Sequence, residues 1–287
     1  MNSIEVKNIA KYYDEECALQ DITLQFVENK IYGLLGRNGA GKSTLLNIIS
    51  NRIFASNGSV FIDGENIINN DFALNKLFLV NDKNQYPKHM KIKNIYEWTK
   101  QFYPEFDLEY AQHLSKEFSL DVNKSVKSLS TGYTSVLKII LALSVNTPYL
   151  LLDEPTLGLD ANHRDLFYRL LIEKYSENPC TIIISTHLID EITNVIEEIV
   201  IIDQGKIIRN ESTEDLLSQG YTISGPADAI DAYIAEKKVL GVDTLGGLKT
   251  AYIIGIAEDT IPINLEQSRT ELQKLFIQMT SNGEELR

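Results

Sequence analysis

Cysteines, long apolar runs and positive charge are all scarce in this sequence. Only two of its 287 residues are cysteines, Cys17 and Cys180, which is too few for a disulfide framework and typical of a reducing compartment. No apolar run approaches the ~18–20 residues that cross a bilayer. The first residues, MNSIEVKNIAKYYDEE, lack the apolar core of a signal peptide. If the protein works at a membrane, we expect another chain to supply the span.

Acidic residues clearly outnumber basic ones. The formal net charge is −13 and the isoelectric point is about 4.8. This balance argues against binding of nucleic acid through a basic surface, so no nucleic-acid partner is expected. Hydrophobic residues make up 44% and charged residues 23% of the chain, as in ordinary globular proteins. The length is enough for one large domain and a small one.

Apolar strands that alternate with helices predict an α/β fold with a mostly parallel sheet. Apolar and polar residues alternate over residues 3–13 and 18–27, which predicts two strands. IYGLLG at 31–36 is predicted to be a buried strand, followed by an amphipathic helix at 42–53. Residues 82–148 are aromatic and helix-forming. Apolar strands such as YLLLD and TIIIST then alternate with helices again, which is typical of a sheet buried on both faces.

The pattern changes once more near the C-terminal end. We predict a large α/β domain over 1–219, with a helical subdomain at about 82–148, and a small accessory α+β module over 220–287. The sequence shows no internal repeat, low-complexity tract or long linker between these parts.

GRNGAGKS, at 36–43, satisfies the phosphate-loop pattern G-x-x-x-x-G-K-[ST] and lies between a predicted strand and a predicted helix. Its glycines let the backbone N–H groups turn inward toward phosphate oxygens, Lys42 would neutralise the terminal phosphates, and Ser43 would offer a hydroxyl to Mg²⁺. The residues expected around a nucleotide are Gly36, Arg37, Asn38, Gly39, Ala40, Gly41, Lys42, Ser43 and Thr44.

Two acids and a histidine follow later strands. Asp153, at the tip of YLLLD, is placed to hold Mg²⁺ through its water shell, and Glu154 to polarise an attacking water as a general base. An alternative for this pair is a helix N-cap with an acidic neighbour. His187 closes the strand TIIIST, at the sheet edge where ligands of open α/β sheets bind, and there it would contact a terminal phosphate.

A second anion-binding turn, LSTGY at 129–133, stands before an apolar helix. The order of GRNGAGKST, LSTGY, LLLDEPTLGLD and ISTH resembles the ATP-binding subunit of an ABC transporter over residues 1–210. The resemblance implies a P-loop NTPase with a RecA-like core, an antiparallel β subdomain and a helical subdomain. It also implies that ATP and Mg²⁺ are the cofactors.

In that family two ATP-binding domains pair head to tail, and the signature of one closes over the ATP of the other. By resemblance, Ser130 and Gly132 serve the partner's ATP. Thr131 and Tyr133 depart from the usual L-S-G-G-Q signature, in which a glycine and a glutamine stand at these positions. Asp160, which closes LGLD, resembles the D-loop aspartate that communicates across the dimer.

Two further positions stay open at this stage. Tyr13 resembles the aromatic residue that stacks on adenine, with Tyr12 as the alternative. The family's metal-contacting glutamine would fall on Asn81 or Asp82 in LFLVNDKNQYP, and Asp82 is the choice among the metal-site residues, together with Ser43 and Asp153. Gln85 lies too far along the chain to take this role.

The resemblance implies an ATPase at the cytoplasmic face of the cell membrane, as a homodimer or heterodimer with a second ATP-binding subunit, powering separately encoded membrane permease subunits. The C-terminal module resembles the short extensions of ABC-2-type exporter ATPases of Gram-positive bacteria, which suggests export of a peptide, antimicrobial, drug or lipid-like substrate. The alternative is an ABC ATPase acting on ribosomes or DNA. A GTPase is disfavoured because NKSV, at 123–126, lacks the aspartate of a guanine-reading motif.

Overall fold

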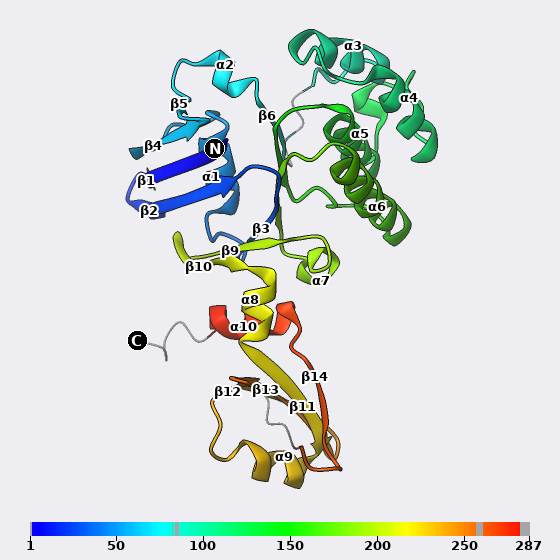
Figure 1. Cartoon of the computed structure of the whole chain (residues 1–287). Helices are drawn as coiled ribbons and strands as arrows, with labels where there is room; N and C mark the ends of the chain where they lie inside the picture. Colours follow the sequence, from blue (N-terminus) through cyan, green and yellow to red (C-terminus); the bar gives the residue numbers. More distant parts are fainter. Residues whose placement is uncertain (1, 82, 84–85, 257–260, 282–287) are drawn as a thin grey trace. The chain divides into compact units, whose positions relative to one another are not determined.

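The computed structural model describes residues 2–81, 83, 86–256 and 261–281. The chain folds into two compact units, each described here by itself (Figure 1). The first consists of the chain up to His187 and Glu198–Asn210, and the second of Leu188–Glu197 and the chain from Glu211 onward. The boundary expected at residues 219–220 stays a prediction. Among the described residues, no helix is both long and apolar enough to span a membrane.

The first unit is built on a six-stranded sheet with the order β10-β9-β3-β8-β7-β6. Strands β9, β3, β8, β7 and β6 pair in parallel, as predicted. Every residue of the three central strands is buried, which explains why their sequences show no polar alternation. The strands are β3 (Ile31–Leu35), β6 (Leu77–Val80), β7 (Tyr149–Asp153), β8 (Thr181–Thr186), β9 (Glu198–Asp203) and β10 (Lys206–Ser212).

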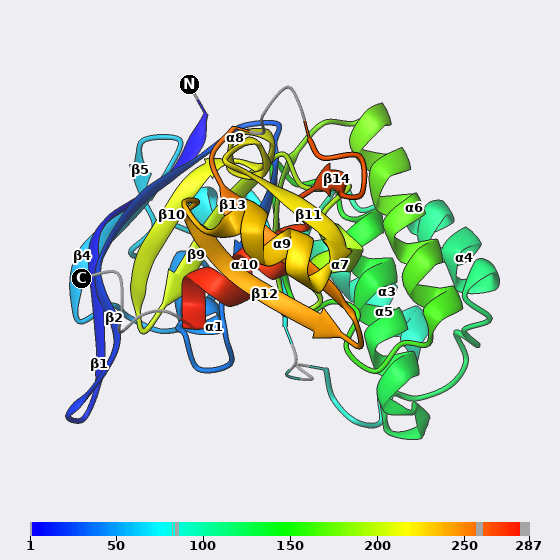
Figure 2. The same ribbon diagram turned by 90° about the horizontal axis from the view of Figure 1, so that it is seen from below.

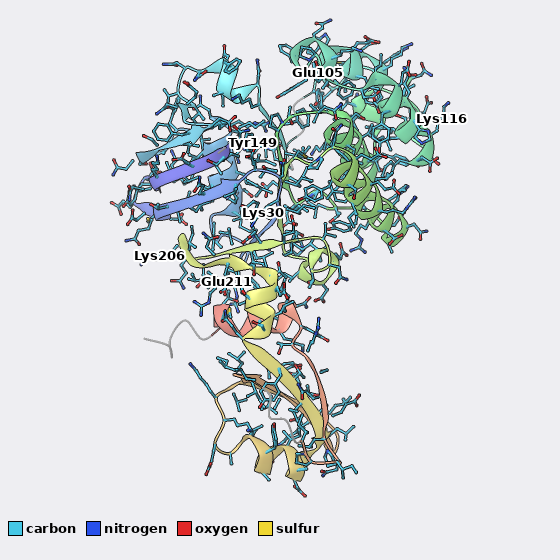
Figure 3. The ribbon with its side chains drawn as sticks, viewed as in Figure 1. Lys30, Glu105, Lys116, Tyr149, Lys206 and Glu211 are labelled. Atoms are coloured by element: carbon cyan, nitrogen blue, oxygen red, sulfur yellow. The ribbon has the colours of Figure 1, made fainter. Side chains whose placement is uncertain are left out.

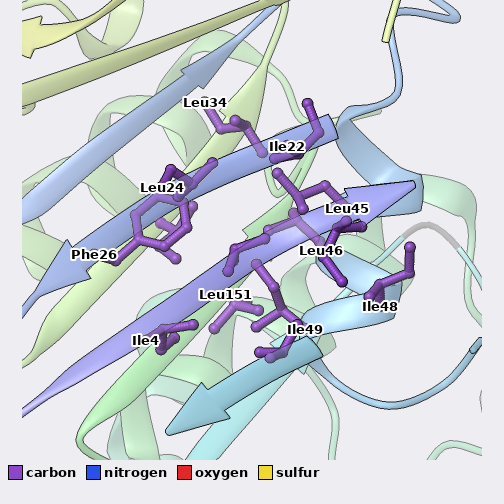
Figure 4. Packing of buried hydrophobic residues seen from close by; sticks show 14 of the residues in the cluster. Ile4, Ile22, Leu24, Phe26, Leu34, Leu45, Leu46, Ile48, Ile49 and Leu151 are labelled. Atoms are coloured by element: carbon purple, nitrogen blue, oxygen red, sulfur yellow. The ribbon is translucent and has the colours of Figure 1, made fainter. Parts of the chain in front are cut away.

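A separate antiparallel sheet has the order β2-β1-β4-β5. Its buried side chains pack with helix α1 and the parallel sheet in one core, where Phe26, Leu46 and Leu151 come from the three layers (Figure 4). Burial of this continuous apolar surface is the main force that holds the layers together. The elements are β1 (Ser3–Tyr13), β2 (Glu16–Val27), β4 (Asn57–Ile62), β5 (Glu65–Asn66) and α1 (Lys42–Ile49).

The region predicted to be helical contains three α-helices that pack on one another, and α5 also contacts β6 (Figure 1). Helix α5 is the most apolar of them, since eight of its residues are buried, whereas α3 and α4 each bury one face. The remaining helices of the first unit are short or follow β7. The helices of the first unit that follow α1 are α2 (Asp71–Leu74), α3 (Ile92–Phe102), α4 (Leu108–Glu117), η1 (Val126–Ser128), α5 (Thr131–Ser144) and α6 (Ala161–Glu177).

The second unit is a small α+β fold. A four-stranded antiparallel sheet has the order β12-β13-β11-β14, and α9 packs across β11 and β13 (Figure 2). Its core includes Ile223, Ile230 and Ala251, which are fully buried. The elements are α7 (Ile189–Ile192), α8 (Thr213–Ser218), β11 (Gly220–Pro226), α9 (Ala227–Ile234), β12 (Val239–Leu245), β13 (Leu248–Ile254), β14 (Glu266–Arg269) and α10 (Leu272–Ser281).

A partly buried polar link joins the two sheets of the first unit. Tyr149 on β7, labelled in Figure 3, donates a hydrogen bond to Asp63, which follows β4. The other carboxylate oxygen of Asp63 lies 2.7 Å from Lys76 Nζ. Burial alone would raise the pKa of Asp63, but the hydrogen bonds from Lys76 and Tyr149 and the charge of Lys76 outweigh it and hold this pKa below its usual value.

Asp63→Asn is expected to lower the free energy of unfolding by about 1–3 kcal/mol at pH 7, because hydrogen bonds to a charged group are lost. Since the folded-state pKa is depressed, this contribution is present above the unfolded-state pKa and fades as the pH falls through the folded-state value. Urea unfolding should therefore show a larger difference from the parent at pH 7 than at pH 3. Glu5→Gln, in the exposed pair with Lys7, is the matched control and should cost under about 1 kcal/mol.

Candidate nucleotide-binding site

The loop between β3 and α1 is shaped by its glycines. Gly39 and Gly41 have φ angles of +82° and +108°, which L side chains rarely adopt. A Cβ on Gly36 would lie 2.5 Å from the Ile202 carbonyl oxygen, so the loop also packs closely on β9. Because Gly41 is the N-cap of α1, the loop ends at a helix N-terminus and presents backbone N–H groups suited to an anion.

Lys42 lies in the first turn of α1 and is only 6% exposed. Its Nζ donates to the carbonyl oxygens of Gly36 at 2.7 Å and Arg37 at 3.2 Å. Burial lowers the pKa of Lys42, and the charges of Glu154 and Asp153 oppose that shift. The amine therefore lies within electrostatic reach of both acids, on the loop predicted to hold phosphates.

Asp153 and Glu154 occupy different environments although they are adjacent. Asp153 ends β7 and is 4% exposed, whereas Glu154 follows with a φ of +49°, in the left-handed region that costs a non-glycine residue about 1–3 kcal/mol. The Glu154 N–H donates to the Ser185 carbonyl at 2.8 Å, and Thr186 Oγ1 donates to Glu154 Oε2 at 3.3 Å. These contacts with the end of β8 hold the strained residue in place.

The imidazole of His187 contacts the carboxylate of Glu154 directly. Its Nδ1 lies 2.9 Å from Oε2 and 3.0 Å from Oε1 of Glu154, and its side chain is 46% exposed. The imidazole thus binds the carboxylate, and the exposed part of the imidazole ring stays accessible to a ligand. The sequence placed both residues at strand ends, and the structure places them in contact.

The signature turn, Leu129–Tyr133, leads into α5. Ser130 is the exposed N-cap of this helix, and its Oγ accepts a hydrogen bond from the Tyr133 N–H at 3.2 Å. A Cβ on Gly132 would lie 2.7 Å from the Gly158 carbonyl oxygen, which belongs to the D-loop, Leu157–Asp160. Ser130 therefore keeps its hydroxyl at an open helix end while the turn is backed by the D-loop.

The stretch after β6 is described in part. Asn81 is 5% exposed and, together with Glu154, Thr131 and Lys138, lines a cavity of about 250 Å³. Asp82 and Gln85 lie outside the described residues. Of the two positions considered for the metal-contacting residue, the structure thus places Asn81 beside the cavity that Glu154 also lines.

Tyr12 and Tyr13 end strand β1, and the structure gives them the same exposure, 46% each. The Lys11 Nζ lies 5.0 Å from the centroid of the Tyr13 ring, in a cation–π contact that leaves the ring exposed. The stacking of adenine on Tyr13, or on Tyr12, stays a prediction.

The ABC transporter family model matches residues 19–157. The chain is 26% identical over 279 residues to the ABC transporter ATP-binding protein YtrB of Bacillus subtilis, covering 92% of this chain and 96% of that protein. Residues 19–157 thus match the ABC transporter family, and the relatives that align over most of the chain are named ATP-binding proteins. The chain is also 28% identical over 242 residues to the petrobactin import ATP-binding protein YclP of Bacillus subtilis, covering 79% of this chain and 96% of that protein.

Among solved structures, the ATP-binding cassette MJ0796, a dimer in a post-hydrolysis state with ADP and Pi, matches with a TM-score of 0.64. The identity is 24%, and the match covers 73% of this chain and 98% of that one. The predicted fold class, a P-loop NTPase with parallel and antiparallel sheets and a helical subdomain, is confirmed. The prediction that the protein is an ATPase is also confirmed.

The oxygen ligands offered by Ser43 and Asp153 would fit a magnesium ion. Ser43 is exposed in the first turn of α1, and Asp153 ends β7. A hydroxyl and a carboxylate are hard oxygen ligands of the kind that Mg²⁺ prefers, and phosphate oxygens would complete such a site. No group of three or more histidine, cysteine or acidic side chains placed to hold a metal occurs among the described residues.

The sequence did not predict that Ser185 and Thr186 hold Glu154 in place by hydrogen bonds. Thr186 immediately precedes His187 and donates to the Glu154 carboxylate, and the Ser185 carbonyl receives the Glu154 N–H. The signal was present in the motif ISTH, where a serine and a threonine precede the histidine. Only the parallel pairing of β7 with β8 shows that these residues reach Glu154.

Proposed function

We propose that this ABC ATP-binding subunit powers transport by separately encoded membrane subunits, from the cytoplasmic face of the cell membrane. The observation that carries the proposal is a pair of half-sites in one chain. One half holds the phosphate loop, the two acids and His187, and the other is the exposed Ser130 at the N-terminus of α5. Two ATP-binding subunits, identical or different, would complete each other's sites.

In the proposed cycle, ATP binding closes the dimer and hydrolysis reopens it. The loop N–H groups and Lys42 bind the phosphates, and the partner's copy of the Ser130 turn closes over the terminal phosphate. Glu154, held by Thr186 and His187, accepts a proton from the attacking water as general base. When bound, Mg²⁺ supplies charge neutralisation of the phosphate oxygens.

We propose that the direction is export, of a peptide, antimicrobial, drug or lipid-like substrate. The support is the resemblance of the C-terminal module to the short extensions of ABC-2-type exporter ATPases. The match to YtrB also extends over 92% of this chain, beyond the length of the ATPase motifs. Because YclP is named for import, the direction needs its own test.

The test is an affinity purification of tagged Glu154→Gln protein from its native membranes in the presence of ATP, with mass spectrometry of the chains that co-purify. The proposal expects a stoichiometric multi-span protein, and the identity of the ATP-binding chains separates homodimer from heterodimer. Recovery with ribosomes or nucleoid proteins and without a membrane chain would overturn the transport proposal. If a membrane chain is found, uptake and efflux in inside-out vesicles containing the complex would decide the direction.

A further inference from the structure

His163 joins two functional segments of the chain that are separate in sequence. It lies in the first turn of α6, and its Nδ1 is 3.3 Å from Oδ2 of Asp160 in the D-loop. Its ring centroid lies 6.4 Å from that of Tyr133, in an edge contact with an interplanar angle of 61°. The ring separation is within the range of attractive ring pairs, and the contact with Asp160 is an ion pair when the imidazole is protonated. Tyr133 is the residue that stands in place of the usual signature glutamine.

The backbones of the same two segments already touch. Gly132 and Gly158 approach so closely that a Cβ on Gly132 would meet the Gly158 carbonyl at 2.7 Å, and Ser135 Oγ donates to the Leu157 carbonyl at 2.6 Å. This contact fixes the middle of the D-loop against the start of α5. His163 adds a side-chain link between Tyr133, which lies within this contacting stretch of α5, and Asp160, at the far end of the D-loop.

A third segment supports the histidine from behind. Phe118, the C-cap of α4, lies with its ring centroid 5.7 Å from that of His163. Three segments therefore meet at one imidazole, while its own backbone N–H donates to Asp160 Oδ1 at 2.9 Å as part of the α6 cap. Because that cap uses the backbone, substitution of the His163 side chain leaves it in place.

We propose that His163 is a positioning residue that makes the signature turn and the D-loop of one subunit move as a single body during ATP-driven closure. The inference rests on the proposed function, since it assumes a head-to-tail dimer in which both segments face the partner. Tyr133 stands where the family has glutamine, and its ring makes the contact with His163. The departure from the usual signature and the histidine therefore act together. Loss of the link leaves each segment folded and their backbone contact in place, but lets Tyr133 and Asp160 shift relative to each other before they meet the partner.

The test measures ATP-driven dimerisation in the Glu154→Gln background by sedimentation, with and without His163→Ala. We expect the dimer dissociation constant in saturating Mg-ATP to rise about fivefold to tenfold, because side chains that the variant monomer no longer holds in place must be ordered when the dimer forms. The affinity of the monomer for a fluorescent ATP analogue should stay unchanged, because His163 does not touch the phosphate loop. His113→Ala is the matched control, since His113 stacks on Tyr110 in α4 at 6.4 Å and contacts neither segment.

A double-mutant cycle separates positioning from a general packing role. Tyr133→Ala and His163→Ala should be strongly non-additive in the dimer constant, and His163→Phe should recover the part that depends on the ring contact. Unchanged dimerisation in His163→Ala, additive effects, or an equal loss in His113→Ala would each overturn the inference. If Glu154→Gln with His163 intact fails to dimerise with ATP, the proposed function falls, and the inference falls with it.

Discussion

Replacing Glu154 with glutamine is expected to slow ATP hydrolysis by about 10²–10⁴-fold, the range that a positioned general base contributes. Glutamine has nearly the same shape, so it can still accept the hydrogen bond from Thr186 and keep the backbone contact with Ser185. It cannot take a proton from water at neutral pH. Binding of ATP should remain, because Lys42 and the phosphate loop are untouched.

Single-turnover release of phosphate measures the chemical step, and equilibrium binding of ATP measures the site that holds the nucleotide. The matched control is Glu177→Gln, the same exchange at an exposed position near the end of α6, and it should leave both quantities unchanged. A loss of less than about tenfold in Glu154→Gln would contradict the assignment of Glu154 as the base. In that case His187, which lies 2.9 Å away, would be the next group to test.

Gly41→Ala is expected to destabilise the protein by about 2–5 kcal/mol and to lower ATP turnover at least about 100-fold. Two physical effects add at this position. The φ of +108° strains any L side chain, and the new Cβ would lie 2.6 Å from Leu19 Cδ2 and 2.8 Å from the Ala18 carbonyl oxygen. A shift of the loop by about 1 Å is enough to misplace the phosphates for reaction.

Gly64→Ala separates these effects. Gly64 has a φ of +81° with nothing within 4 Å of the added Cβ, and it lies in the turn between β4 and β5, outside the phosphate loop. It should therefore cost only about 1–2 kcal/mol of stability from backbone strain and leave turnover unchanged. Thermal unfolding and steady-state ATPase assays of both variants measure the two quantities. Equal turnover in Gly41→Ala and the parent protein would contradict the role given to the loop geometry.

Features encoded in a short stretch of chain were predictable from the sequence. The phosphate loop is one, because glycine spacing, a preceding apolar strand and a following helix are all local. The parallel sheet is another, because strands buried on both faces lose their polar alternation. The positions of Asp153, Glu154 and His187 at the ends of such strands were predictable for the same reason, whereas their roles stay predictions.

Features that depend on contact between distant segments were not predictable. The approach of Gly132 to Gly158, and the place of His163 between Tyr133 and Asp160, require the packing of α5 against α6. The sequence gives His163 no motif of its own. The grouping of Leu188–Glu197 with the chain beyond Glu211 likewise needs the tertiary structure, because β9 and β10 come between the two parts.

That grouping has a consequence for the order of events during synthesis. Domains usually fold from the N-terminal side as the chain leaves the ribosome. Here Leu188–Glu197 emerges before β9, which completes the parallel sheet of the first unit, and well before the strands of the second unit. Helix α7, which starts two residues after His187 and packs against α10, must therefore wait for the latter half of the second unit to be made. The newly made protein should therefore have a complete phosphate loop before Leu188–Glu197, the segment that follows His187, reaches its final packing.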